Sequence, residues 1–185
     1  MTDIVGLWDS GRHIVDVVAA RRLVESWTAD PELVDRRVLA RVIEHEGREL
    51  LACLLWDHAG RSRGLAVRAL DGGALPADTF TPWPGLTMAA PVALKLMRDR
   101  DGAAAYVREH GAIVTSGIEQ FLRWATWEKD NSRRPAVFGV AGRHWSPAFA
   151  QRLPSGVDVL LAGVDDDVIR RAFATRGDVR FKKGA

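Results

Sequence analysis

The chain has 185 residues, of which 47% are hydrophobic and 27% are charged, and its formal net charge is +2. This length and composition predict one domain with a buried core, or one domain with a small N-terminal subdomain, and they exclude a disordered chain. The small net charge excludes a polycation, so contact with nucleic acid would need a local basic patch. No apolar run approaches the roughly 18 residues of a membrane span, and no signal-peptide pattern opens the sequence. We therefore expect a cytoplasmic protein with no membrane partner.

The first part of the chain, residues 1–87, predicts a small α+β subdomain. Apolar residues at helical spacing predict a helix over 13–27. Three β-type runs separated by turns that contain glycine predict an antiparallel meander, with strands at 37–44, 49–56 and 62–70. The single cysteine, Cys53, lies in the second run, so an intrachain disulfide is excluded and a buried thiol is expected. Prolines and glycines in 71–87 then predict a linker.

The second part, residues 88–185, alternates helices with strands. Two helices come first, at 88–98 and 102–110. Strands are then expected at 112–115, 136–140, 157–164 and 178–181. Helices are expected between them, at 118–127, 146–153 and 167–175. Strands that alternate with helices of about ten residues form parallel βαβ units, so this part predicts an α/β domain whose parallel sheet has about four strands, with helices on both faces.

Three consecutive carboxylates, Asp165, Asp166 and Asp167, follow a nearly continuous apolar strand. In an open α/β sheet, the carboxyl ends of parallel strands carry the functional loops. Asp165 and Asp167 point the same way in an extended segment, which makes them candidate ligands of Mg²⁺ or Mn²⁺. The alternative is that the acids cap the next helix, where aspartate is favoured and complements the helix dipole.

The order of strands, glycine turns and acids resembles the Toprim domain, the catalytic fold of bacterial-type primases, topoisomerases and certain nucleases. The matching segments are IVTSGIEQFL at 113–122, VFGVAG at 137–142 and VLLAGVDDD at 159–167. They are most similar to Toprim domains of phage and mobile-element primases. The resemblance implies Mg²⁺-dependent, primase-like nucleotidyl or phosphodiester chemistry in DNA replication. It also implies that Asp165, Asp167 and Glu119 are the catalytic and metal-binding residues.

The matching segments depart from the Toprim pattern in ways that bear on activity. Ser116 stands where the family has its first acid, and a serine cannot act as the general base there. Val168 and its neighbours replace a glycine that follows the acid pair, and no Cys/His zinc ribbon is present. Two hypotheses stay open: an active primase-like nucleotidyltransferase or nuclease, and a catalytically degenerate module that binds nucleic acid or a replication partner. A third is a small-molecule-binding α/β domain.

Basic and aromatic residues of the second part are candidates for contacts with DNA or RNA. The proposed nucleic-acid-binding residues are Arg143, His144, Arg170 and Arg171. The first two follow the strand at 136–140 and are expected at the same sheet edge as Asp165, where they would contact phosphate. With Trp124, Trp127 and Trp145 nearby in the sequence, the basic residues of this part, among them Arg133 and Lys182, could form a groove that follows the phosphates while the rings stack bases. The alternative is an ordinary loop histidine, solvated helix faces and core tryptophans.

Overall fold

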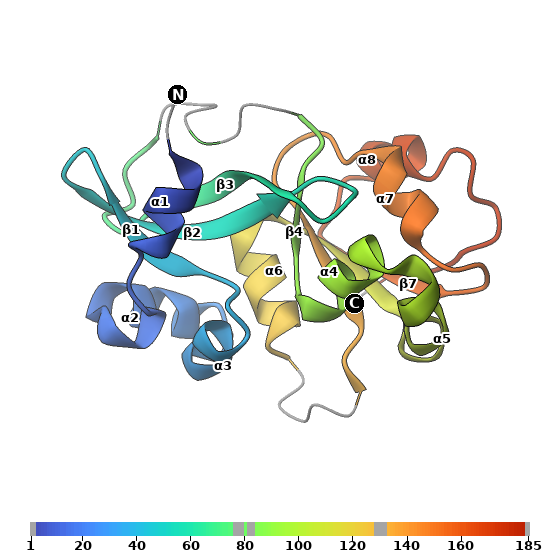
Figure 1. Cartoon of the computed structure of the whole chain (residues 1–185), viewed down its shortest axis with the longest axis horizontal. Coiled ribbons are helices and arrows are strands. Elements are labelled where there is room, and N and C mark those ends of the chain that lie inside the picture. Colours follow the sequence, from blue (N-terminus) through green and yellow to red (C-terminus); the bar gives the residue numbers. More distant parts are fainter. Residues whose placement is uncertain (1–2, 76–79, 81–83, 128–132, 184–185) are drawn as a thin grey trace.

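The computed structural model describes residues 3–75, 80, 84–127 and 133–183. Its strands form one mixed sheet in the order β1-β2-β4-β6-β5-β7-β8, with β3 paired to β2 (Figure 1). The strands are β1 (Arg41–His45), β2 (Arg48–Trp56), β3 (Ser62–Ala69), β4 (Thr87–Ala89), β5 (Ala112–Ser116), β6 (Ala136–Val140), β7 (Asp158–Ala162) and β8 (Arg180–Lys183). The helices are α1 (Ile4–Asp9), the 3-10 helix η1 (Ile14–Asp16), α2 (Val18–Ser26), α3 (Pro31–Arg36), α4 (Pro91–Arg98), α5 (Arg100–His110), α6 (Gly117–Ala125), α7 (Pro147–Arg152) and α8 (Asp166–Ala172).

The second part of the chain folds into parallel βαβ units. β5 lies in the middle of these strands, with β6 on one side and β7 on the other, and both run parallel to it. β8 continues the parallel sheet beyond β7. The helices α6, α7 and α8 connect these strands in chain order, as short apolar strands alternating with amphipathic segments require. The predicted α/β fold, with a parallel sheet of about four strands and flanking helices, is confirmed.

The predicted antiparallel meander is present in the first part. β1 pairs with β2, and β2 pairs with β3, in both cases antiparallel. The first strand begins at Arg41 instead of residue 37, because α3 and a turn precede it and Val38 adopts a left-handed φ of 54°. Sequence patterns did not predict α1, whose start is capped by Asp3 through a 3.0 Å hydrogen bond from the Gly6 N–H.

A short strand, β4, corrects the expectation of a linker followed by one helix over 88–98. Thr87–Ala89 pairs antiparallel with β6, and Thr87 also pairs with Trp56 of β2. α4 begins only at Pro91, because proline suits the first helical position and lacks a backbone N–H to donate. Both Thr87 and Met88 are completely buried, so packing against the sheet overrides local helix propensity. β4 joins the strands of both parts into one sheet, and the division at residue 87 stays a prediction.

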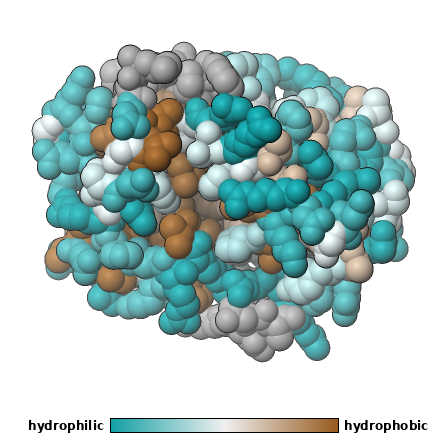
Figure 2. Space-filling model, in the orientation of Figure 1, coloured by the Kyte–Doolittle hydropathy of each residue, from teal (hydrophilic) through white to brown (hydrophobic). Residues whose placement is uncertain are grey.

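Helices cover the sheet on both faces. One core cluster joins α6 to the meander, α2 and α3, and a second packs α4, α5, α7 and α8 on the opposite face of the parallel strands. A third, smaller cluster packs α1 on the meander. Figure 2 shows hydrophobic residues gathered over α1 and the strands behind it, whereas the side of the molecule that carries α5, α7 and α8 is mostly hydrophilic.

The expected buried thiol is confirmed. Cys53 lies in β2 with no exposed surface and is not disulfide-bonded. Burial raises the pKa of the Cys53 thiol, which keeps it protonated and chemically inert. None of the helices in the described ranges has both the length and the apolar character needed to span a bilayer.

Candidate nucleic-acid interface

The carboxyl ends of three parallel strands meet at one edge of the sheet, here called the carboxyl edge. Ser116 of β5 is in register with Val140 of β6, and its neighbour Thr115 is in register with Ala162 of β7. α6, α7 and α8 all begin at this edge, directly after these strands. The parallel pairing therefore brings the turn at 116–119, the loop after β6 and the loop after β7 next to one another.

Two acids that follow β7 make contacts within the protein. Asp165 is the N-cap of α8, and its carboxylate accepts a 2.7 Å bond from the Asp167 N–H. The carboxylate of Asp167 pairs with Arg170 at 3.1 Å. Glu119 is exposed in the first turn of α6. Capping, the alternative considered for these acids, is thus the role in which the structure places Asp165.

The arrangement of these carboxylates does not fit a preformed metal centre. Within the described ranges, no three His, Cys, Asp or Glu side chains converge closely enough to hold a metal ion. One oxygen of Asp165 is committed to the helix cap, and one oxygen of Asp167 is committed to Arg170. The assignment of Mg²⁺ or Mn²⁺ to Asp165, Asp167 and Glu119 stays a prediction.

Replacing the capping acid gives a direct test of its role. We expect Asp165→Ala to lower the free energy of unfolding by about 1 kcal/mol, because the α8 cap is lost, and Asp165→Asn to cost much less, because asparagine also caps helices. Asp167→Ala should change stability little, since its ion pair with Arg170 is exposed. Urea unfolding with and without Mg²⁺ measures these differences. A stabilisation of wild type by Mg²⁺ that both Asp165→Asn and Asp167→Ala abolish would instead assign the carboxylates to a metal.

A cavity of about 540 Å³ opens at the carboxyl edge, between this edge and β3. We call it the carboxyl-edge pocket. Gly117 and Ile118 of α6 line one side, and Ala141 lines it from the loop after β6. The opposite side comes from β3 and the turn that follows it, and α6 packs against β3 there. Arg68 is the one charged side chain among the described lining residues, so the pocket is electropositive.

The helix that points into this pocket lacks a side-chain cap. Of the three helices that begin at the carboxyl edge, α7 is capped by Ser146 and α8 by Asp165, whereas Ser116 makes no cap bond at the start of α6. The first N–H groups of a helix have no intrahelical partner and carry the positive end of its dipole. Gly117, with φ of 73°, leaves open space where a side chain would lie. An anion therefore has access to the start of α6.

The cation across the pocket is held in place by an aromatic ring. Arg68 is exposed, and its guanidinium carbon lies 5.1 Å from the centre of the Trp27 ring. A cation over the face of a tryptophan is attracted by the ring quadrupole, which restricts the arginine side chain without neutralising its charge. Sequence reasoning missed Arg68, because β3 and α6 lie far apart in the sequence and come together only in the fold.

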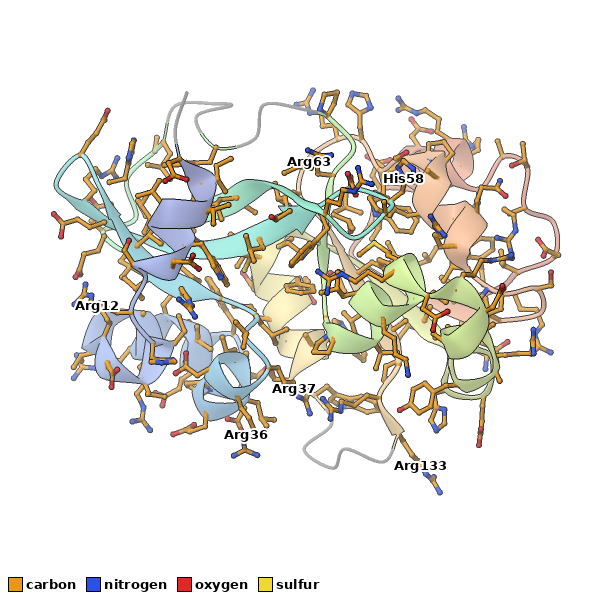
Figure 3. All side chains as sticks on the ribbon, viewed as in Figure 1. Arg12, Arg36, Arg37, His58, Arg63 and Arg133 are labelled. Atoms are coloured by element: carbon orange, nitrogen blue, oxygen red, sulfur yellow. The ribbon has the colours of Figure 1, made fainter. Side chains whose placement is uncertain are left out.

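The predicted basic residues lie around the carboxyl edge, and they differ in whether an ion pair or a hydrogen bond holds the side chain. Arg143 and His144 are exposed in the loop after β6, the loop that also supplies Ala141 to the pocket. Arg170 and Arg171 are exposed on α8, where Arg170 pairs with Asp167 and Arg171 donates to its carbonyl oxygen. Figure 3 shows His58, in the turn between β2 and β3, and Arg63, near the start of β3, at the same end of the molecule.

The predicted stacking role of Trp145 is wrong. Its ring is only 3% exposed and packs among Phe138, Phe149 and Phe173. The indole N–H donates to the Thr87 hydroxyl at 3.0 Å. Trp145 is therefore a core residue that ties the loop after β6 to β4.

The fold and the open carboxyl edge define a mixed α/β protein built around parallel strands. No protein-family model and no curated protein matches the chain. Among solved structures, one that is similar is the bacteriophage T7 lagging-strand DNA polymerase interacting with primase domains bound to an RNA/DNA hybrid and dTTP. Its TM-score is 0.50 at 12% identity, covering 87% of this chain and 64% of that chain.

A second similar structure is the primase fragment of the bacteriophage T7 primase-helicase protein. Its TM-score is 0.46 at 13% identity, covering 85% of this chain and 62% of that chain. The chain thus spans less than two thirds of each of these two structures' chains. At such low identity, the first likeness concerns the fold alone: a primase-like arrangement of strands and helices.

Proposed function

We propose that this chain is a Toprim-like, primase-like module that binds single-stranded DNA or RNA at its carboxyl edge. The observation that carries the proposal is the carboxyl-edge pocket, where the uncapped start of α6 faces Arg68. A phosphate in this pocket would accept bonds from the first N–H groups of α6 and would be attracted by the guanidinium. The fold, which is similar to that of a primase-containing structure, supports a role in replication.

The apolar part of the pocket suits the rest of a nucleotide. Ile118 and Leu75, both only partly buried, line it beside the polar start of α6. Base rings are flat and apolar on their faces, so they can pack on such side chains while the phosphate remains near Arg68. Arg143 and His144, exposed on the adjacent loop, would contact the next phosphates along the strand.

A second candidate is an active enzyme with the same nucleic-acid site. Its support is the adjacency of β5 and β7, which places the turn with Glu119 beside the loop with Asp165 and Asp167. Bound Mg²⁺ or Mn²⁺ would neutralise charge at a phosphodiester. Because Ser116 stands at the position of the family's first acid, no carboxylate is available there to transfer a proton. Asp165 caps α8, and Asp167 pairs with Arg170. These observations favour the module that binds without a preformed catalytic centre.

Binding measured at several salt concentrations tests the proposal. With fluorescently labelled oligo(dT) and oligo(U), we expect the affinity to fall steeply between about 50 and 200 mM salt, because phosphate contacts release counterions. A primer-synthesis and nuclease assay with Mg²⁺ or Mn²⁺ separates the module, which should show no product, from the enzyme. An affinity that does not change with salt would contradict phosphate binding at the carboxyl edge.

A further inference from the structure

A second cavity, of about 510 Å³, lies at the opposite end of the parallel strands. We call it the amino-edge cavity. The starts of β5 and β7 line it through Ala112 and Asp158, and Trp124 of α6 and Trp127, just after this helix, also line it. Because four residue-to-residue steps of about 3.3 Å separate Ala112 from Ser116 along β5, this cavity lies about 13 Å from the carboxyl edge. It is therefore separate from the pocket described above.

Trp127 gives this cavity an open aromatic face. Its side chain is 61% exposed, whereas Trp8, Trp27 and Trp145 are each less than a tenth exposed. The ring is supported from one side by Trp124, with the ring centres 5.6 Å apart and the planes inclined at 58°. A large, supported aromatic ring left in solvent is a surface on which another flat ring can stack.

The charges around this ring favour an anionic ligand. Arg108, Arg133 and Lys182 line the cavity together with Glu109 and Asp158, which leaves an excess of one positive charge (three minus two). Asp158 is paired with Lys182 and with Arg180, at 2.7 Å in each case, so Arg180 adds a further positive charge at its rim. The hydrogen bond from Lys182, with the charge of Arg180, lowers the pKa of Asp158. Figure 3 shows Arg133 extending away from the ribbon at this end of the molecule.

We propose that the amino-edge cavity is a second contact for single-stranded nucleic acid, in which a base stacks on Trp127 and the flanking phosphates lie near Arg133 and Lys182. Stacking on an aromatic ring beside cations is how proteins hold single strands without reading their sequence. A protein partner is less well matched, because Glu109, Asp158 and Lys182 belong to residue types that are depleted at the centre of protein–protein interfaces. The inference rests on the proposed function only for the class of ligand, since the two sites share no residue.

Paired substitutions at Trp127 test the stacking contact. Trp127→Leu keeps apolar bulk but removes the aromatic face, whereas Trp127→Phe keeps a ring. We expect Trp127→Leu to weaken binding of labelled oligo(dT) about tenfold, and Trp127→Phe to weaken it much less, because phenylalanine keeps a ring face on which a base can stack. Unlabelled oligo(dT) should quench tryptophan fluorescence in wild type and quench it less in Trp127→Phe. The matched control is Phe181→Leu, at another exposed ring, which should bind as wild type does.

The outcomes separate this inference from the proposed function. If Trp127→Leu binds with wild-type affinity, the amino-edge site is overturned, and Trp127 would instead contact a protein. If Arg68→Glu still weakens binding in that case, the carboxyl-edge site stands. Loss of affinity in Trp127→Leu with wild-type affinity in Arg68→Glu overturns the carboxyl-edge site alone. Wild-type protein that does not bind oligo(dT) overturns both. Equal losses in Trp127→Leu and Trp127→Phe would also contradict stacking, and thermal unfolding confirms that each variant is folded.

Discussion

Reversing one charge, with Arg68→Glu, should weaken binding of single-stranded DNA or RNA by tenfold or more. Arg68 is the one charged side chain among the described lining residues of the carboxyl-edge pocket, and it faces the uncapped start of α6. A glutamate there would repel the phosphate that the helix N–H groups attract. The loss should be similar for different base sequences, and the slope of log affinity against log salt should decrease by about one. Fluorescence anisotropy with oligo(dT) at several salt concentrations measures both quantities.

Arg36→Glu is the matched control for this prediction. Arg36 is also exposed, and the substitution changes the net charge of the protein by the same amount. It lies on α3, away from the lining of the carboxyl-edge pocket, and Figure 3 shows it pointing into solvent. We expect its binding to remain within about twofold of wild type at moderate salt, because distant exposed charges are screened. Equal losses in Arg36→Glu and Arg68→Glu would show that only the overall charge matters.

Arg176→Met should destabilise the protein by about 3 kcal/mol, which for a chain of this size lowers Tm by roughly 6–12 °C. Arg176 is only 8% exposed. Its guanidinium donates to the carbonyl oxygens of Ala150 and Leu153 and pairs with Asp178 at 2.6 Å. Methionine would fill the space but leave the Leu153 carbonyl without its donor and the Ala150 carbonyl with only the Leu153 N–H. Differential scanning calorimetry and urea unfolding measure the loss.

Two further variants test whether the burial and the planar guanidinium of Arg176 cause the expected loss of stability. Arg180→Met removes an exposed arginine from an ion pair with Asp158 and should cost no more than about 1 kcal/mol. Arg176→Lys should not restore stability, since an ammonium group lacks the planar fork that serves two carbonyls and a carboxylate. A loss in Arg180→Met as large as that in Arg176→Met would show that burial is not the cause.

The pH dependence of the stability difference between wild type and Arg176→Met follows from Asp178. The hydrogen bonds from Arg176, and then from Ser155, hold the pKa of Asp178 well below its usual range. A lowered pKa in the folded state contributes stability above the unfolded value, near about 4, and this contribution is lost as the pH falls toward the folded value. The difference in stability between wild type and Arg176→Met should therefore be largest above pH about 4 and narrow in more acidic solution.

Much of the sheet follows from local sequence patterns. The apolar runs of β5, β6 and β7, separated by helical segments, predict parallel strands, and the turns with glycine predict the meander. β4 could not be found in this way. It is three residues long, precedes a proline that starts a helix, and is held by the burial of Thr87 and Met88 between distant strands. Its signal lies in tertiary packing, which no window of the sequence contains.

The candidate site, too, could be predicted only in part from the sequence. Parallel strands bring their carboxyl ends together, so the sequence could place Glu119, Asp165 and His144 at one edge. It could not determine that Asp165 caps α8, since aspartate after a strand suits both a cap and a metal ligand. It also gave no reason to expect that Ser116, a residue type that usually caps helices, would leave α6 uncapped. Arg68 comes from a part of the chain about fifty residues away and reaches the pocket through the fold alone.

The narrow junction at β4 has a mechanical consequence. A single residue pair, Trp56 with Thr87, hydrogen-bonds β4 to β2, while the Thr87 hydroxyl also contacts Gly139 and receives the Trp145 indole N–H. The core cluster that joins α6 to the meander carries the rest of the contact between the two sides. A strand of nucleic acid that touches both β3 and α6 would add a further link across the same junction.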